Sequence, residues 1–141
     1  MPITATSSHG TTLMVGDGAS PEGFTAVAKL TSISGPASSA AVIDTTGLED
    51  TYATKLLGII DSGQVSFEGL LLLGNTQHDG LFTDHQARTL RNFRIQTVAA
   101  SPAEYVAFAA YVVALSAPGA AMNQANTISG TLEVSGAVTY P

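Results

Sequence analysis

The sequence predicts a mainly β protein, either a β-sandwich or a partly open barrel, with one short α-helix beside it. Residues 64–69 and 127–138 alternate polar and apolar side chains, which is the two-residue period of strands with one buried face. Between residues 76 and 88, capping residues precede a segment with one apolar side, as at the start of a helix. Many strands and a single helix favour packed or curled β layers.

The N-terminal half contains three further short apolar segments, separated by turns rich in Gly and Pro. They predict strands at Thr11–Val15, Phe24–Ile33 and Ala41–Thr45. Residues 46–62 show little apolar periodicity and predict a long loop. A loop longer than about 12–15 residues in a compact domain is usually functional or disordered.

The next strand has a clear apolar side and a clear polar side. Its apolar side is formed by Val65, Phe67, Gly69, Leu71 and Leu73, and its polar side by Gln64, Ser66 and Glu68. The helix that follows is predicted over residues 76–88. Either Asn75 or Thr76 is a suitable N-cap, and Asp79 is favourable near the positive end of the helix dipole.

Three strands are predicted in the remaining sequence. Leu90–Val98 alternates, Tyr105–Leu115 is uncharged and almost entirely apolar, and the last alternates from Thr127 to Val138. We expect Tyr105–Leu115, including Tyr105, Phe108, Tyr111 and Val112, to be buried on both sides or to lie in a subunit contact. Its eleven residues are too few for a membrane-spanning helix, which needs about 20.

Composition suggests that much of the surface is covered by other subunits. The 141 residues fit one domain, expected at 11–141, after a Ser/Thr-rich N-terminal arm at 1–10 that we expect to be flexible. Only 11% of residues are charged and 45% are hydrophobic, whereas about 25% are charged in typical soluble domains. The simplest way to cover such a surface is contact with copies of the same chain.

Charge argues against a nucleic-acid-binding protein, and the cysteine content excludes disulfides and thiolate metal sites. The net charge of −6 opposes binding to a nucleic acid backbone. Arg88, Arg91 and Arg94 lie close together in the sequence. A phosphate-binding patch is the less favoured interpretation; we favour a helix end and an exposed strand face whose arginines could pair with acids of the same or a neighbouring subunit. The absence of cysteine excludes disulfides and thiolate metal sites. The N-terminus lacks the basic and apolar segments of a signal peptide.

The sequence contains no convincing metal or catalytic site. His78 and His85 are separated by about 10.5 Å along a helix, so they cannot share one ion, and we expect them on an exposed helix face. The acids Asp44, Glu49, Asp50 and Asp61 do not have the spacing of an EF-hand; a looser calcium site is a less favoured alternative to solvated charge. No nucleophile elbow or phosphate-binding glycine loop is present. We expect no enzyme activity, metal or cofactor.

The centre of the sequence resembles the phage tail tube proteins, or major tail proteins, of long non-contractile tails. The similarity starts with Ile43–Asp50, Gly58 and Asp61–Gly69, where an acidic, Thr-rich segment and a long loop join two strands. It continues, in order and spacing, through four further segments and covers roughly residues 11–140. These segments are Asn75–Arg88, Arg91–Val98, Tyr105–Val113 and Glu133–Val138. Some relatives carry an additional immunoglobulin-like domain that has no counterpart here.

The resemblance implies a structural virion protein made in the host cytoplasm and located in the virion tail. Hexameric rings would stack into a hollow tube through which DNA passes without specific binding. Tape measure, tail terminator and distal tail proteins would be the other partners, and no membrane is involved. The residues expected in the ring-stacking loop are Asp44, Thr45, Thr46, Gly47, Leu48, Glu49, Asp50, Lys55 and Asp61; those expected to line the channel are Gln64, Ser66, Glu68, Thr131, Glu133 and Ser135.

Two alternatives remain open from the sequence. One is another structural role, as a capsid decoration or head–tail joining protein. The other is a β-sandwich carbohydrate-binding module. Sugar-binding surfaces usually present aromatic side chains, whereas this sequence has no Trp and few aromatic residues outside its predicted strands.

Overall fold

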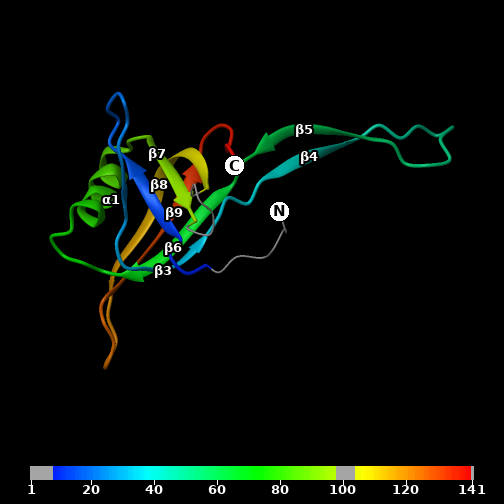
Figure 1. The fold of residues 1–141 in the computed structure, drawn as a ribbon. Coiled ribbons are helices and arrows are strands. Elements are labelled where there is room, and N and C mark those ends of the chain that lie inside the picture. The colour runs from blue at the N-terminus through cyan, green and yellow to red at the C-terminus, as the bar shows by residue number, and fades with distance from the viewer. Residues whose placement is uncertain (1–7, 98–103, 141) are drawn as a thin grey trace.

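The computed structural model describes residues 8–97 and 104–140 and confirms a mainly β protein with one helix (Figure 1). One sheet has seven strands in the order β2-β1-β7-β8-β9-β6-β3, and every pairing in it is antiparallel. Its strands are β1 (Thr12–Gly16), β2 (Phe24–Ala26), β3 (Leu30–Ser34), β6 (Gln64–Leu70), β7 (Arg91–Gln96), β8 (Tyr105–Gly119) and β9 (Thr127–Val134). We call this sheet, together with helix α1 (Thr76–Ala87), the body.

The seven-stranded sheet curls into a partly open barrel. Strands β2 and β3 are consecutive in the chain, yet they lie at opposite ends of the strand order. The short connection between Ala26 and Leu30 therefore brings the two edges of the sheet near one another. It contains Lys29 in a left-handed conformation with φ of 61°. Among the described strands no ladder joins β2 to β3, so the barrel stays open along this seam.

A second, two-stranded sheet projects from the body. Strands β4 (Ser39–Asp44) and β5 (Lys55–Asp61) pair only with each other among the described strands. Together with their loop they form the β4–β5 ribbon, residues 39–61, which extends away from the body on the side opposite α1 (Figure 1). The turn between β8 and β9 forms a second, shorter projection.

The core lies between the curled sheet and α1. Alternate residues of β6, β7, β8 and β9 point inward, so Phe67, Phe93, Phe108 and Leu132 are all at most 4% exposed. The rings of Phe93 and Phe108 stack with their centroids 6.0 Å apart. Leu81 connects the helix to this cluster. The inward period of two is the alternation from which β6, β7 and β9 were predicted, whereas β8 was predicted from its continuous apolar sequence.

The helix begins and ends as its sequence indicates. The side chain of Asn75 accepts a hydrogen bond from the backbone N–H of His78, which makes Asn75 the N-cap. Arg88 adopts a left-handed conformation at the C-cap and its N–H donates to the carbonyl of Asp84. The predicted helix at 76–88 is confirmed to within one residue.

Several predicted strand boundaries were wrong. The predicted strand Phe24–Ile33 is two strands, because Lys29 turns the chain from one sheet edge to the other. Leu73, predicted on the apolar face of a strand, lies beyond β6 and is 83% exposed. The apolar strand at residues 105–115 continues to Gly119, past a register shift after Val112. The predicted N-terminal arm lies mostly outside the described residues.

Candidate assembly surfaces

The β4–β5 ribbon contains all of the residues predicted for a stacking loop. The predicted loop at residues 46–62 was too long, because Lys55–Asp61 forms β5 and pairs with β4. Asp44 ends β4 directly opposite Lys55, which begins β5. Asp61 ends β5 opposite Ser39 at the base of the ribbon, and the predicted residues from Thr45 to Asp50 lie in the connecting loop. The sequence did not reveal β5, since its apolar residues do not alternate with polar ones.

Local hydrogen bonds give the connecting loop a defined shape. The N–H of Thr45 donates to the carbonyl of Thr54 at 2.9 Å, which extends the ribbon by one rung. The N–H of Thr46 donates to Asp44 Oδ1 at 2.9 Å, and that of Gly47 to Asp50 Oδ2 at 2.7 Å. The hydrogen bonds from Thr46 lower the pKa of the Asp44 carboxyl. The turn at the end of β4 therefore favours the charged form of Asp44.

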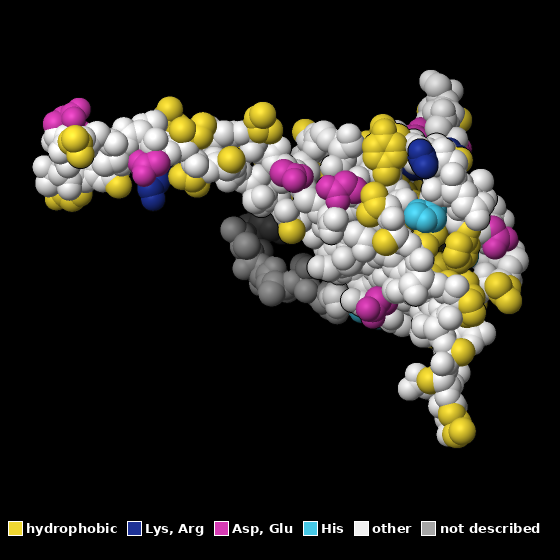
Figure 2. Space-filling model, turned by 180° about the vertical axis from the view of Figure 1, so that it is seen from behind, with side chains coloured by type: hydrophobic (Ala, Val, Ile, Leu, Met, Phe, Trp, Pro, Cys, Tyr) yellow, Lys and Arg dark blue, Asp and Glu magenta, His cyan; other side chains and the backbone are white. Residues whose placement is uncertain are grey.

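The ribbon exposes an unusual amount of apolar side chain. Figure 2 shows hydrophobic side chains along its length and acidic ones at its outer end. Leu48 and Ile59 are 106% and 90% exposed. The large apolar residues of the ribbon that are exposed are Val42, Ile43, Leu48, Tyr52, Leu56, Leu57, Ile59 and Ile60. A two-stranded hairpin is at best marginally stable alone in water, and an apolar surface of this kind marks an interaction site.

Most of the residues predicted to line a channel form one continuous polar surface. On the outward face of the body, Gln64 of β6 lies opposite Glu133 of β9, and Ser66 lies opposite Thr131. Gln64 Nε2 donates to Glu133 Oε2 at 2.7 Å. Glu68 continues the same face along β6 and is exposed. Ser135 lies just beyond the end of β9, and its N–H donates to the carbonyl of Ala109.

Strand β8 has one buried face and one exposed face. Phe108 and Val112 belong to the core, at 4% and 5% exposed. Tyr105 and Tyr111 point outward and are 42% and 39% exposed. Two placements were predicted for this segment, and the first, burial on both sides, is wrong for the isolated chain. Its outward face, which also carries Val113 at 46% exposed, remains a candidate subunit contact.

Arg94 of β7 lies between two aromatic rings on this outward surface. Its guanidinium carbon is 3.5 Å from the centroid of Phe24 and 4.3 Å from that of Tyr105, which is a cation–π arrangement on both sides. Its buried Nε has no hydrogen-bond partner among the residues that the structure describes. Sequence reasoning missed this site because the three residues are far apart in the chain.

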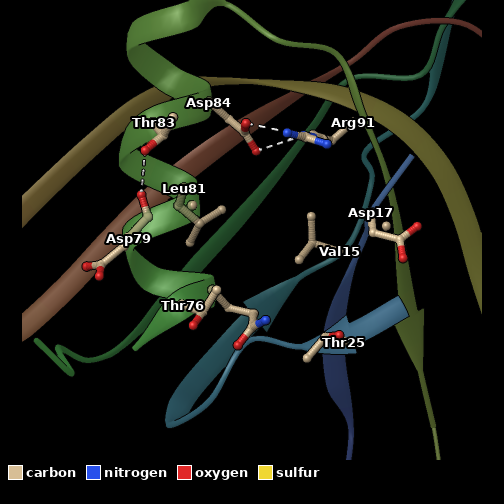
Figure 3. A pocket seen from close by; sticks show the side chains of 12 residues that line it. Val15, Asp17, Thr25, Thr76, Asp79, Leu81, Thr83, Asp84 and Arg91 are labelled. Atoms are coloured by element: carbon tan, nitrogen blue, oxygen red, sulfur yellow. Dashed lines mark hydrogen bonds and ion pairs between the residues drawn. The ribbon is translucent and has the colours of Figure 1, made fainter. Parts of the chain in front are cut away.

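A pocket of about 550 Å³ lies between α1 and strands β1 and β2. Arg91 and Asp84 meet at its edge, with Arg91 Nε 3.2 Å from Asp84 Oδ2 (Figure 3). The interpretation that one of the three arginines pairs with an acid of the same subunit is confirmed for Arg91. Asp17 also lines the pocket, and hydrogen bonds from the N–H groups of Ala19 and Gly23 lower the pKa of its carboxyl.

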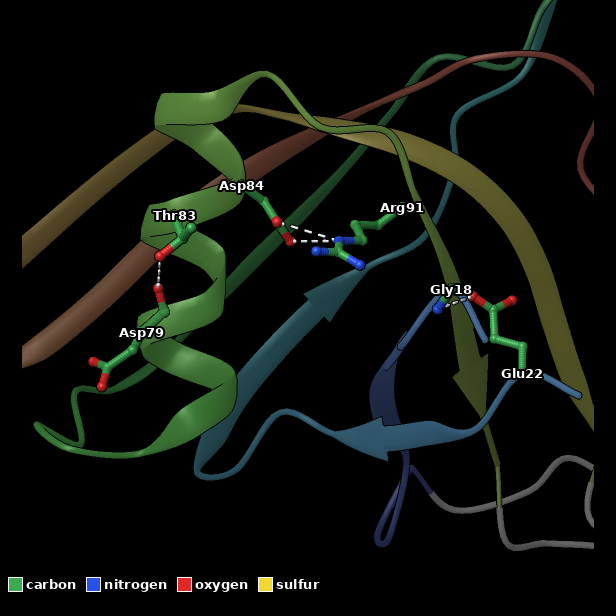
Figure 4. Close-up of polar contacts among 6 residues, drawn as sticks. All are labelled: Gly18, Glu22, Asp79, Thr83, Asp84 and Arg91. Carbon is green, nitrogen blue, oxygen red and sulfur yellow. Dashed lines mark hydrogen bonds and ion pairs between the residues drawn. The ribbon is translucent and has the colours of Figure 1, made fainter. Parts of the chain in front are cut away.

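The polar contacts around this pocket are structural ones. Thr83 Oγ1 donates to the Asp79 carbonyl within α1, and the N–H of Gly18 donates to Glu22 Oε2 in the β1–β2 turn (Figure 4). Within residues 8–97 and 104–140, no three His, Asp or Glu side chains are placed so that they could hold a metal ion. The acids Asp44, Glu49, Asp50 and Asp61 are spread along the ribbon.

The expected exposure of the two helix histidines was wrong for His78, which is 0% exposed. His78 Nε2 donates to the Ala28 carbonyl at 2.8 Å, and His78 Nδ1 accepts from the N–H of Leu72 at 3.4 Å. His85, which is half-buried, donates from Nδ1 to the Val112 carbonyl at 2.9 Å. Both histidines thus fix the helix to other segments of the body through backbone carbonyl groups.

No helix in the described part of the chain is long and apolar enough to cross a bilayer. No curated protein is similar enough in sequence to match this chain. Solved structures are similar in fold at low sequence identity. A chain of the virion of a native gene transfer agent particle has a TM-score of 0.76 at 13% identity, with 97% of this chain and 99% of that chain covered.

Two further structures share this fold. A chain from the tail of an empty gene transfer agent particle with C6 symmetry has a TM-score of 0.71 at 14% identity, covering 92% of this chain and 95% of that chain. The SPP1 tail tube protein has a TM-score of 0.65 at 14% identity, covering 93% and 77% respectively. The family model described as phage tail tube, TTP, lambda-like matches residues 4–103. The chain therefore belongs to the lambda-like phage tail tube protein family.

Proposed function

We propose that this chain is the subunit of a tail tube. It forms hexameric rings that stack into a hollow tube in a virion tail, and DNA passes through the tube during ejection. The observation that carries this proposal is the β4–β5 ribbon, an apolar extension that has no partner in the described part of its own chain. Family membership and the C6 symmetry of a tail with a similar chain support the ring and its size.

Ring formation suits the open barrel. A contact between different surfaces of identical subunits forms a closed ring when the rotation from each subunit to the next adds up to one full turn. Such rings can then stack along an axis. The edge strands β2 and β3 offer unpaired backbone groups, which are a hazard for a free monomer. Pairing between neighbouring subunits would cover these edges. The same contact would also cover the exposed outward face of β8.

The role of the ribbon is to join one ring to the next. It extends well beyond the body (Figure 1), so it can reach a copy that its own sheet cannot touch. Its loop from Thr45 to Asp50 carries most of the residues that we propose for stacking. Replacing residues 46–53 by Asn-Gly would keep both strands but remove the outer end, because these two residues form a tight hairpin turn. Rings that no longer elongate are the expected result.

The channel wall is the polar face of β6 and β9. Gln64, Ser66 and Glu68 lie beside Thr131 and Glu133 on one surface, and Ser135 follows at its end. Acidic and neutral polar groups repel the phosphates of DNA and stay hydrated. This face therefore suits a passage that DNA crosses without binding, and no metal or cofactor has a role in it.

Electron microscopy of the purified protein tests the tube itself. Rings or tubes with a central channel are expected, and a strictly monomeric protein at high concentration would contradict the proposal. The channel is tested by changing Glu68 and Glu133 together to Lys in infectious particles. Assembly should continue while DNA ejection slows, because the wall would then attract phosphates. Changing both residues to Gln is the matched control, since Gln removes the charge without reversing it.

The remaining partners follow from this role. A tube of fixed length needs a tape measure protein inside it, a terminator at one end and distal tail proteins at the other. We propose no catalytic activity for this chain. Neither a capsid decoration role nor carbohydrate binding is favoured by a specific feature of the structure.

A further inference from the structure

We infer that Arg94 is a positioning residue, which holds the edge strand β2 in place for contact with the neighbouring subunit of a ring. It acts through its guanidinium group, which lies between the rings of Phe24 and Tyr105. This inference deepens the ring proposed above and rests on it, because it names the residue that prepares one of the two free sheet edges. The observations behind it are the weak attachment of β2 and two side-chain contacts that reach it from β7.

Strand β2 has few backbone contacts to hold it. It is three residues long and, among the described strands, pairs with β1 alone. Its ladder with β1 contains the pairs Met14–Ala26, Val15–Thr25 and Gly16–Phe24. Segments with few buried contacts and solvent-exposed backbone hydrogen bonds open locally at low cost. Backbone pairing with β1 alone would therefore leave this edge open for part of the time.

Two side chains of β7 reach past β1 to this edge. Asn92 Nδ2 donates to Oε1 of Glu22 at 2.8 Å, in the turn just before β2. Two residues further along β7, the guanidinium carbon of Arg94 lies 3.5 Å from the centroid of the Phe24 ring, at the first position of β2. The same carbon lies 4.3 Å from the centroid of Tyr105 in β8. Arg94 therefore connects the edge strand to the central strand of the sheet.

Small residues make this span possible. Gly16 extends the outward face beside Phe24, and Ala107 lies opposite Arg94. Opposite residues share a face of the sheet, so these two positions place no long side chain between the guanidinium group and the rings. Tyr105 is the diagonal neighbour of Arg94, two residues from Ala107, and diagonal neighbours are within reach of aromatic and long side chains.

Packing alone does not explain an arginine at this position. The Nε of Arg94 is buried and has no hydrogen-bond partner among the described residues, and a buried donor without a partner destabilises a folded chain. The guanidinium cation is attracted to the faces of both rings, which an apolar side chain of the same length would not be. The contact that depends on the charge is therefore the one that holds β2.

Hydrogen exchange in the monomer tests the clamp directly. Arg94→Met removes the charge and keeps an unbranched side chain between the rings, whereas Arg94→Lys keeps the charge. The backbone N–H groups of residues 24–27 should exchange about 5- to 30-fold faster in Arg94→Met, the range that corresponds to losing the cation–π contacts. Those of β9 should be unchanged, and Arg94→Lys should recover most of the protection. Unchanged exchange at residues 24–27 in Arg94→Met would overturn the inference.

Ring formation tests the consequence of the clamp. Arg94→Met should raise the protein concentration needed for rings by at least about 3-fold, because only monomers with β2 in place can pair. Arg94→Lys should need a concentration close to that of the unchanged protein. Arg88→Met is the control, since it removes the same charge from an exposed position at the end of α1 and should form rings normally. Sedimentation velocity measures all four proteins.

A disulfide distinguishes positioning from direct contact with the neighbour. The N–H of Val27 donates to the Leu13 carbonyl at 2.8 Å, so the adjacent pair, Met14 and Ala26, is one that exchanges no backbone hydrogen bonds. The Cα atoms of such a pair are about 4.5 Å apart, which is within the range of a disulfide. Met14→Cys with Ala26→Cys should therefore tie β2 to β1, since the chain has no other cysteine.

Added to Arg94→Met, the oxidised disulfide should restore ring formation, and the same disulfide in the otherwise unchanged protein is the control. Failure of this rescue would show that Arg94 contacts the neighbour itself, and the inference would be wrong. If Arg94→Met forms rings at the same concentration as the unchanged protein, the inference is also wrong, although the ring proposal stands. If the unchanged protein forms no rings, the proposed function fails, and this inference fails with it.

Discussion

Replacing Val112 by Asp should prevent folding, whereas the same change at Val113 should not. Val112 is 5% exposed within the core, and Val113, its neighbour at the register shift of β8, is 46% exposed. Losing the buried valine costs about 1.5–3 kcal/mol. Keeping the buried Asp neutral at pH 7 requires a pKa raised by about three units, which costs about 4 kcal/mol more.

The sum, about 5.5–7 kcal/mol, is comparable to the whole stability of many domains, which is about 5–15 kcal/mol. Val113→Asp should change stability by no more than about 0.5 kcal/mol, as is usual for exposed positions. Urea unfolding followed by circular dichroism and tyrosine fluorescence measures both, since the chain has four Tyr and no Trp. Equal urea midpoints for the two variants would refute the placement of Val112 in the core.

Three further predictions concern the body. Gly130→Ala should destabilise the protein by about 1–3 kcal/mol in thermal unfolding, because the new Cβ would lie 2.6 Å from Cζ of Phe67. The control is Gly80→Ala, whose Cβ meets nothing within 4 Å; it should be neutral or stabilising by up to about 1 kcal/mol. Equal losses of stability in the two variants would contradict the packing around Gly130. His78→Ala should cost about 2–5 kcal/mol in urea unfolding, since it leaves a cavity and unpaired backbone groups; a wild-type midpoint would argue against its burial. In an NMR titration the pKa of Asp17 should lie below the usual range for Asp. The stabilisation that this carboxylate gives the β1–β2 turn is therefore present above its unfolded pKa and is lost as pH falls through the lowered folded pKa. A normal pKa would show that the hydrogen bonds of the turn are absent.

Sequence reasoning succeeded where one physical signal was sufficient. Strands β6 and β9 were predictable because each has one face in the core and one in water, which imposes a period of two. The helix was predictable because Asn75 caps it within a few residues. The polar face formed by Gln64 and Glu133 followed from the same alternation, although only the register showed that the two strands are neighbours.

The remaining features depend on contacts between distant parts of the chain. Strand β5 has no alternation because neither of its faces packs against the body, so its sequence resembles neither a half-buried strand nor a polar loop. The turn at Lys29 requires a left-handed conformation in a residue type that rarely adopts it. His78 is buried because carbonyl and N–H groups of Ala28 and Leu72 satisfy its ring, and neither partner can be identified from sequence spacing.

The exposed ribbon has a consequence for how sensitively tube growth responds to sequence change. In the proposed six-subunit ring, six identical ribbons engage together when one ring joins another, so their free energies add within a single multivalent event. A substitution that weakens each contact by only about 0.5 kcal/mol would change ring addition by about 3 kcal/mol, or roughly 150-fold. Alterations too small to measure in a monomer would then decide whether a tail of full length is built.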